Sequence, residues 1–145
     1  MTTSQSLVLV EDSADDVELM MRAFRADDIR CDIRVARDGV AAIELLLESS
    51  DMSPPAVVLL DLKLPGVDGF GVLRRIRGDP RTWNLPVVIL TSSNEPEDLL
   101  KAYRLGANSY VRKPMSFREL LIATQQIAAY WLLLNERPPT SRSGV

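Results

Sequence analysis

Five short apolar runs alternate along the chain with five stretches of helical periodicity, and this alternation limits the fold more than any other feature. The apolar runs cover residues 6–10, 32–36, 56–60, 86–90 and 109–111. The third and fourth, AVVLL and PVVIL, contain no polar side chain, which is typical of strands that are covered on both faces.

Helical spacing predicts helices over residues 14–26, 38–47, 68–76, 96–105 and 116–134. The first helix places Val17, Met20 and Phe24 on one face, and Ser13 is in position to cap its amino end. Strand–helix alternation of this kind predicts an α/β fold with a parallel sheet, helices on both faces and right-handed crossovers.

One domain accounts for most of the 145 residues in this interpretation. No internal repeat or low-complexity linker divides the chain, and we expect the domain to occupy residues 1–135. Residues 136–145, ERPPTSRSGV, contain two adjacent prolines and no periodicity, so they are predicted to form a flexible tail.

Composition excludes several classes of function. The net charge of -3 provides no basic surface for nucleic acid, and no apolar run is long enough for a membrane span. The N-terminus lacks the features of a signal peptide, and the single cysteine, Cys31, fits a reducing compartment, so we expect a cytoplasmic protein. The absence of histidine rules out Ser-His-Asp and Cys-His catalysis and disfavours a zinc site.

Polar residues follow the predicted strands at their carboxyl ends, where open α/β sheets bind ligands. They are Glu11, Asp12, Asp61, Thr91 and Lys113. Three carboxylates at one place repel one another unless a cation neutralises them, and a donor set made only of oxygen favours Mg²⁺. In this interpretation Asp61 is a nucleophile that carries a phosphoryl group, while the metal, Thr91 and Lys113 stabilise its charge.

Each of these residues also has a purely structural interpretation. Glu11 and Asp12 could complement the dipole of the following helix, and Thr91 begins a turn rich in capping residues. Lys113 taken alone could be an ordinary surface lysine. The coincidence of five such groups at the ends of four strands favours a functional site.

Four segments of the sequence carry a resemblance to a known family: VLVEDS, LLDLKLPGVDGFGVL, PVVILTSS and GANSYVRKP. Through these segments, residues 7–134 resemble the receiver domain of two-component response regulators. The resemblance implies a flavodoxin-like, doubly wound (βα)5 fold, in which a five-stranded parallel sheet has the strand order 2-1-3-4-5.

The resemblance also implies roles for individual residues. Asp61 corresponds to the phosphoacceptor, Asp12 to a direct Mg²⁺ ligand and Glu11 to a second acid that acts through water. The backbone carbonyl of Lys63 would supply a further metal contact, which leaves the side chain at that position free to vary.

Two further residues are implied to respond to phosphorylation. Thr91 and Tyr110 resemble the pair in which the hydroxyl turns toward the phosphoryl group and the aromatic ring rotates inward behind it. Lys113 and Pro114 resemble a pair joined by a cis peptide bond, which is only slightly unfavourable before proline and would aim the lysine inward.

The function implied by the resemblance is a signalling relay and not enzymatic turnover. A phosphohistidine on a partner histidine kinase would donate its phosphoryl group to Asp61 in a Mg²⁺-dependent reaction. A conformational change would then pass the signal to a downstream phosphotransfer or target protein. The loop GDPRTWNLP and the late YWL are similar to stand-alone receivers that pair with bacterial phytochrome kinases.

Two other functions compete with this interpretation. Aspartyl-nucleophile phosphatases also combine Asp, Thr, Lys and Mg²⁺, but they place a second acid two residues after the nucleophile, where this chain has Lys63. They also need a cap over the site, for which 145 residues leave little room. A nucleotide-binding fold would need a glycine-rich loop after the first strand, and the sequence has none there.

The last predicted helix carries two apolar stripes. The stripe predicted to face the core contains Phe117, Leu120, Leu121, Thr124, Ala128 and Trp131. The residues on a different side are Ile122, Ala129, Tyr130 and Leu133. A second apolar stripe usually marks a partner site, so we expect a two-fold homodimer through this helix. The alternative is that the tail folds back over Leu133.

Overall fold

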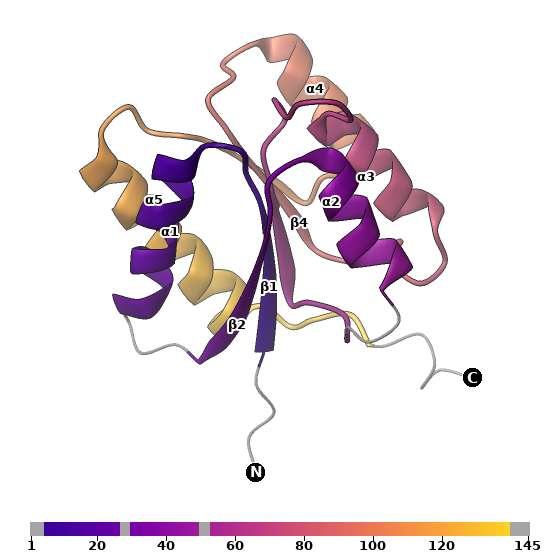
Figure 1. Cartoon of the computed structure of the whole chain (residues 1–145), viewed down its shortest axis with the longest axis horizontal. Helices are drawn as coiled ribbons and strands as arrows, with labels where there is room; N and C mark the ends of the chain where they lie inside the picture. Colours follow the sequence, from indigo (N-terminus) through magenta and orange to yellow (C-terminus); the bar gives the residue numbers. More distant parts are fainter. Residues whose placement is uncertain (1–4, 27–29, 50–52, 140–145) are drawn as a thin grey trace.

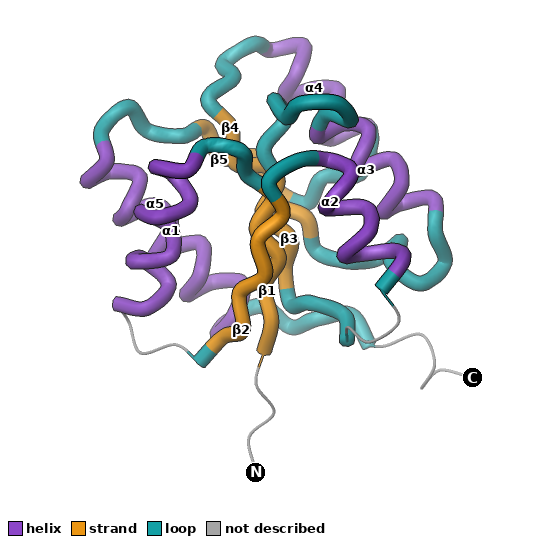
Figure 2. Tube along the Cα trace, in the orientation of Figure 1, coloured by secondary structure: helices purple, strands orange, loops and turns teal. Residues whose placement is uncertain are grey.

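A parallel sheet forms the centre of the computed structural model, which describes residues 5–26, 30–49 and 53–139 (Figures 1 and 2). The strands are β1 (Gln5–Val10), β2 (Cys31–Ala36), β3 (Val57–Leu60), β4 (Val87–Thr91) and β5 (Ser109–Arg112). Their order, β2-β1-β3-β4-β5, confirms the predicted doubly wound α/β fold.

The helices alternate with the strands. They are α1 (Ala14–Ala26), α2 (Gly39–Ile43), α3 (Gly69–Gly78), α4 (Pro96–Arg104) and α5 (Phe117–Ala129), with π-helical turns η1 (Glu44–Glu48) and η2 (Tyr130–Leu134). Three helices begin one residue later than predicted. Asp38, Asp68 and Ser116 are extended caps whose side chains accept a hydrogen bond from the amide three residues later.

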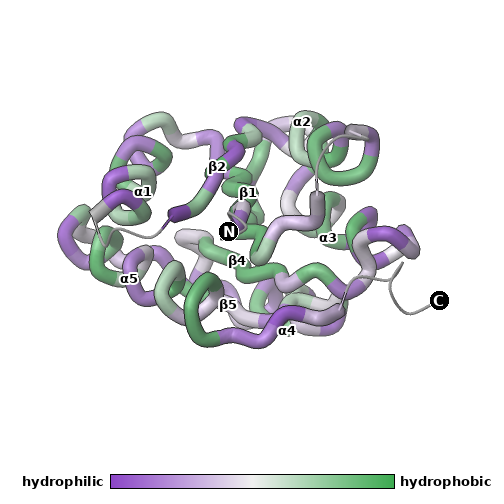
Figure 3. Tube along the Cα trace, turned by 90° about the horizontal axis from the view of Figure 1, so that it is seen from below, coloured by the Kyte–Doolittle hydropathy of each residue, from purple (hydrophilic) through white to green (hydrophobic). Residues whose placement is uncertain are grey.

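The helices cover both faces of the sheet. α1 and α5 lie side by side on one face, and α2, α3 and α4 lie on the other (Figure 1). Alternate residues of β1 divide between these layers, with Leu7 and Leu9 packed toward α1 and α5 and Val8 and Val10 toward α2 and α3. The central strands are mostly hydrophobic, whereas hydrophobic and hydrophilic residues alternate along the surrounding helices (Figure 3).

The register of the sheet brings distant residues to one edge. The last residues of β1 and β3 are aligned, so Glu11 and Asp61 follow their strands side by side. The Asp61 amide donates to the Val10 carbonyl oxygen at 3.0 Å. The Lys113 amide likewise donates to the Thr91 carbonyl oxygen at 2.7 Å, which extends the pairing of β4 and β5 beyond the strands.

The last helix differs from the prediction at its two ends. The middle of the predicted core stripe is buried as expected: Leu120, Thr124 and Ala128. Phe117, in contrast, lies in the first turn with 62% of its surface exposed. At the other end, Trp131 is half-buried against the core between the sheet and the α1/α5 layer, and Leu132, which the predicted stripe did not include, is buried in the π-helical turn.

Residues 136–139 follow the last helix, and Arg137 donates a hydrogen bond to the Pro54 carbonyl oxygen at 3.0 Å. The flexible tail expected over 136–145 stays a prediction, because residues 140–145 lie outside the described part of the chain. Among the described residues, no helix combines the length and the apolar character that a bilayer crossing requires.

Arg77 joins three segments near the amino end of β4. Its guanidinium donates to the carbonyl oxygens of Trp83, Leu85 and Gly106 at 2.7–2.9 Å, and to Oδ1 of Asn108 at 2.8 Å. The rigid planar donor group therefore holds the end of α3 against the segments that lead into β4 and β5.

We expect Arg77→Met to lower the free energy of unfolding by about 3 kcal/mol, because it leaves several carbonyl oxygens without donors. Arg77→Lys should recover only a minor part of the lost stability, since one ammonium cannot reach both the segment before β4 and the segment before β5. Urea titration followed by circular dichroism measures the change, with Arg74→Met, on an exposed position of the same helix, as the control. Equal stabilities of Arg77→Met and Arg74→Met would contradict this role.

Candidate functional site

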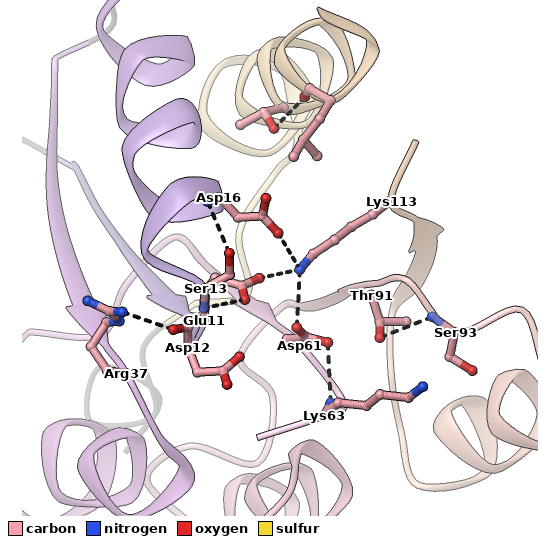
Figure 4. Close-up of polar contacts among 12 residues, drawn as sticks. Glu11, Asp12, Ser13, Asp16, Arg37, Asp61, Lys63, Thr91, Ser93 and Lys113 are labelled. Carbon is pink, nitrogen blue, oxygen red and sulfur yellow. Dashed lines mark hydrogen bonds and ion pairs between the residues drawn. The ribbon is translucent and has the colours of Figure 1, made fainter. Parts of the chain in front are cut away.

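Three carboxylates meet beyond the carboxyl ends of β1 and β3. Glu11 and Asp12 come from the turn before α1, and Asp61 directly follows β3. One oxygen of each carboxylate lies within 4.8 Å of the others (Figure 4). Glu11 and Asp61 are 1% and 6% exposed, whereas Asp12 is open to solvent. This set of hard oxygen donors fits a divalent cation such as Mg²⁺ or Mn²⁺.

Lys113 brings positive charge to the same place from the segment after β5. Its ammonium lies 2.6 Å from Glu11 Oε1, 2.9 Å from Asp16 Oδ2 and 3.2 Å from Asp61 Oδ2. The prediction of a cis peptide bond between Lys113 and Pro114 is wrong, because none of the described peptide bonds is cis. The lysine reaches the acids without it, because its paired amide continues β5 and directs the side chain across the end of the sheet.

Burial and charge together set the protonation of these groups. Burial raises the pKa of Glu11 to about 7, and repulsion from Asp61 adds to the rise, although the hydrogen bond from Lys113 opposes it. Burial alone would lower the pKa of Lys113, but its hydrogen bond to Glu11 and the charge of Asp61 raise that pKa above its usual value. The lysine is therefore held in its charged form.

Thr91 and Tyr110 are linked through Ser93. Thr91 ends β4 fully buried, and its Oγ1 accepts a hydrogen bond from the Ser93 amide at 3.4 Å. The Tyr110 hydroxyl donates to the Ser93 carbonyl oxygen at 3.2 Å, and its side chain is half-buried. Ser93 Oγ donates in turn to Asp98 Oδ2 at 2.6 Å. A movement of Thr91 can thus reach both Tyr110 and α4.

Lys63 contacts the site through its main chain. Its amide donates to Asp61 Oδ1 at 3.3 Å, while its side chain is exposed and extends away from the acids (Figure 4). Gly69 approaches the same turn closely, because a Cβ at that position would overlap the main-chain oxygen of Asp61. Only glycine therefore lets α3 begin this close to the site.

The sequence patterns missed two residues of the site, Asp16 and Ser93. An acid in the first turn of a helix usually complements the helix dipole, and this ordinary explanation concealed the contact of Asp16 with Lys113. The spacing of Asp16 three residues after Ser13 indicates only a helix cap, so the sequence has no signal for the contact with Lys113. The role of Ser93 depends on the path of the loop after β4, for which the sequence has no comparable pattern.

Residues 7–125 match the response regulator receiver domain family. The chain belongs to this family. This result confirms the resemblance found in the four sequence segments, and the strand order of the sheet agrees with the fold that the resemblance implied.

Two known proteins are similar to this chain along most of their length. The probable methanogenesis regulatory protein FilR2 of Methanothrix harundinacea is 42% identical over 134 residues, which cover 91% of this chain and 86% of FilR2. Response regulator Rcp1 of Synechocystis is 36% identical over 129 residues, which cover 87% of this chain and 88% of Rcp1.

Two solved structures have closely similar folds. The phosphorylated cyanobacterial phytochrome response regulator RcpA has a TM-score of 0.90 and 31% identity, over 94% of this chain and 100% of that chain. The Mn(2+)-bound form of Rcp1 has a TM-score of 0.87 and 33% identity, over 93% of this chain and 99% of that chain. This receiver therefore resembles stand-alone phytochrome response regulators.

Lys113→Met should destabilise the metal-free protein by about 3 kcal/mol, because Glu11 and Asp61 then lie buried without a counter-charge. Mg²⁺ should restore part of this stability, so its addition should raise the melting temperature of the variant more than that of the wild type. Thermal unfolding in EDTA and in excess Mg²⁺ measures both effects. Lys63→Met removes an exposed neighbouring lysine and serves as the control; equal responses of the two variants would exclude the buried ion pairs as the cause.

Proposed function

We propose that this protein is a single-domain response regulator that accepts a phosphoryl group on Asp61 from a phosphohistidine of a partner histidine kinase. The observation that carries the proposal is the position of Asp61, a nearly buried carboxylate beside two further acids and in contact with Lys113. Membership of the receiver family supports the same role.

In the transfer step, an oxygen of Asp61 forms a bond to phosphorus while the bond between phosphorus and the donor nitrogen breaks. The imidazole nitrogen leaves with the electron pair of that bond and takes up a proton. Lys113 already contacts Asp61 Oδ2 and is placed to bind an oxygen of the transferred group. Because Thr91 Oγ1 accepts from the Ser93 amide, its own proton can be donated to another phosphoryl oxygen.

Mg²⁺ is the cofactor in this proposal. Asp12 and Asp61 would hold the ion directly, Glu11 through water, and Lys63 through its backbone carbonyl oxygen. When bound, the ion neutralises negative charge on the acids and on the transferred group. The Mn(2+)-bound form of the related Rcp1 supports a divalent cation in a receiver of this type.

The proposed switch consists of Thr91 and Tyr110. Movement of the Thr91 hydroxyl toward a phosphoryl group weakens its contact with the Ser93 amide, and the Tyr110 ring then turns inward. The altered surface around Tyr110 and α4 passes the signal to a target or phosphotransfer protein. Similarity to the phytochrome response regulator RcpA supports a bacterial phytochrome kinase as the phosphoryl donor. In this proposal the transfer takes place in the cytoplasm.

The phosphatase alternative is not favoured. The residue two positions after Asp61, where such an enzyme has its general acid, is Lys63, whose side chain is exposed and extends away from the acids.

Incubation with acetyl phosphate and Mg²⁺ should attach one base-labile phosphoryl group to the wild type, detected by intact-protein mass spectrometry. Asp61→Asn should abolish the adduct, whereas Asp15→Asn, an equal loss of charge at an exposed position of α1, should retain it. A wild-type protein without an adduct would contradict the proposal, and sustained hydrolysis of small phosphate esters would favour the phosphatase. Faster transfer from a phosphorylated phytochrome kinase than from an unrelated histidine kinase would identify the partner class.

The exposed side of the last helix supports a two-fold homodimer as part of the proposal. Ile122, Tyr130 and Leu133 are 44%, 48% and 63% exposed. Residues 136–139 of the predicted tail leave Leu133 open, and the rest of the tail, residues 140–145, lies outside the described part of the chain. Apolar surface of this kind is typical of an interface between protein chains.

Ile122→Asp should convert the proposed dimer to a monomer, because it places an unpaired charge in the apolar contact. Light scattering at micromolar concentration, with and without phosphorylation, measures the molar mass. Val40→Asp makes a similar change at an exposed apolar residue of α2, on the other face of the sheet, and should leave the mass unchanged. A monomeric wild type in both states would rule out the dimer.

A further inference from the structure

A fourth carboxylate, Asp16, binds the lysine of the site from the first turn of α1. Asp16 Oδ2 lies 2.9 Å from the Lys113 ammonium, and the two side chains are 19% and 10% exposed. We propose that Asp16 is a positioning residue that draws Lys113 away from Asp61 and so slows phosphoryl transfer to Asp61, an inference that rests on the proposed role of Asp61 as the phosphoacceptor.

The ammonium of Lys113 is shared among three carboxylates. It has three protons, and its distances to Glu11, Asp16 and Asp61 are 2.6, 2.9 and 3.2 Å. Asp16 approaches the ammonium from α1, on the side opposite to Asp61 (Figure 4). The contact with Asp61 is the longest of the three, so the lysine is divided among the acids and not held chiefly by the phosphoacceptor.

The end of a helix does not by itself require this contact. Asp15 lies in the same first turn, is exposed, and also complements the helix dipole. The amide of Asp16 donates to Ser13 Oγ at 3.3 Å, while its side chain turns toward Lys113 (Figure 4). The specific contribution of Asp16 is therefore its ion pair with the lysine.

The Lys113 side chain borders open space on one side. A cavity of about 410 Å³ borders both Asp16 and Lys113, and its other walls include Asn94, Met115 and Phe117. A side chain beside a cavity is not fixed by close packing on that side. The three carboxylates therefore determine where the ammonium lies.

Asp16 differs from the other two partners because it lies outside the metal-binding cluster of Glu11, Asp12 and Asp61. Its ion pair with Lys113 therefore remains when a cation occupies the cluster. An oxygen of the transferred phosphoryl group then competes with Asp16 for the ammonium. Loss of the Asp16 carboxylate lets the lysine follow the charge that develops on that group, which lowers the barrier to transfer.

The initial rate of phosphorylation by acetyl phosphate, at saturating Mg²⁺, tests the inference. Asp16→Asn should raise the rate about fivefold. Asp15→Asn removes the same charge from the same turn and should leave the rate unchanged. Asp16→Glu retains a carboxylate near Lys113 and should return the rate toward that of the wild type. An Asp16→Asn rate equal to that of Asp15→Asn would overturn the inference.

A double-mutant cycle with Lys113→Ala separates positioning from a general effect of charge. Asp16 acts through the lysine, so Asp16→Asn should not change the rate when Lys113 is already alanine. An acceleration of the same size in that background would mean that Asp16 only repels the anionic donor, and positioning would be excluded.

Mg²⁺ affinity, measured by isothermal titration calorimetry, provides a readout that does not require phosphorylation. In Asp16→Asn the lysine is shared by Glu11 and Asp61 alone, so Mg²⁺ meets a stronger competitor and its Kd should rise about threefold. The same substitution in the Lys113→Ala background should leave the Kd unchanged. If the wild type forms no adduct, the proposed function fails, and the Mg²⁺ affinities still decide whether Asp16 holds the lysine; an unchanged Kd overturns that role.

Discussion

Two almost completely buried carboxylates, Glu11 and Asp61, can remain at the end of an apolar sheet only if positive charge lies beside them. In this receiver the charge is the ammonium of Lys113, which contacts both acids. Repulsion from Asp61 adds to the rise in the pKa of Glu11, and a divalent cation between the two acids would relieve that repulsion. Charge compensation thus connects the stability of this end of the sheet with the binding of a metal ion and a phosphoryl group in the proposed function.

The parallel sheet is what allows four strands to contribute to one site. All carboxyl ends of a parallel sheet lie on the same edge, so residues after β1, β3, β4 and β5 meet although they are far apart in the sequence. β3 lies between β1 and β4, which places Asp61 between Glu11 and Thr91. The strand order therefore makes the acid at position 61 the centre of the site.

The two ends of the sheet are held in different ways. Near the amino end of β4, Arg77 binds four groups on two neighbouring segments and fixes them to α3. At the carboxyl end, Thr91, Tyr110 and Asp98 are connected through individual hydrogen bonds to Ser93. A single hydrogen bond is exchanged far more readily than a network, so the structure combines a firm frame with a loop that can change its contacts.

The sequence by itself determined the order of the elements, the sheet, the receiver family and the polar groups at the strand ends. Local patterns predict these features: apolar runs such as AVVLL, helical spacing, and acids or lysine immediately after a strand. The tertiary structure alone decided that Asp16 shares Lys113, that Lys113 needs no cis bond to reach the acids, and that Leu132 is buried while Phe117 is exposed. The physical reason is that Asp16 and Lys113 are 97 positions apart, and their contact depends on how α1 packs relative to the end of β5. No local pattern specifies the distance between two packed elements, whereas every ion pair depends on it.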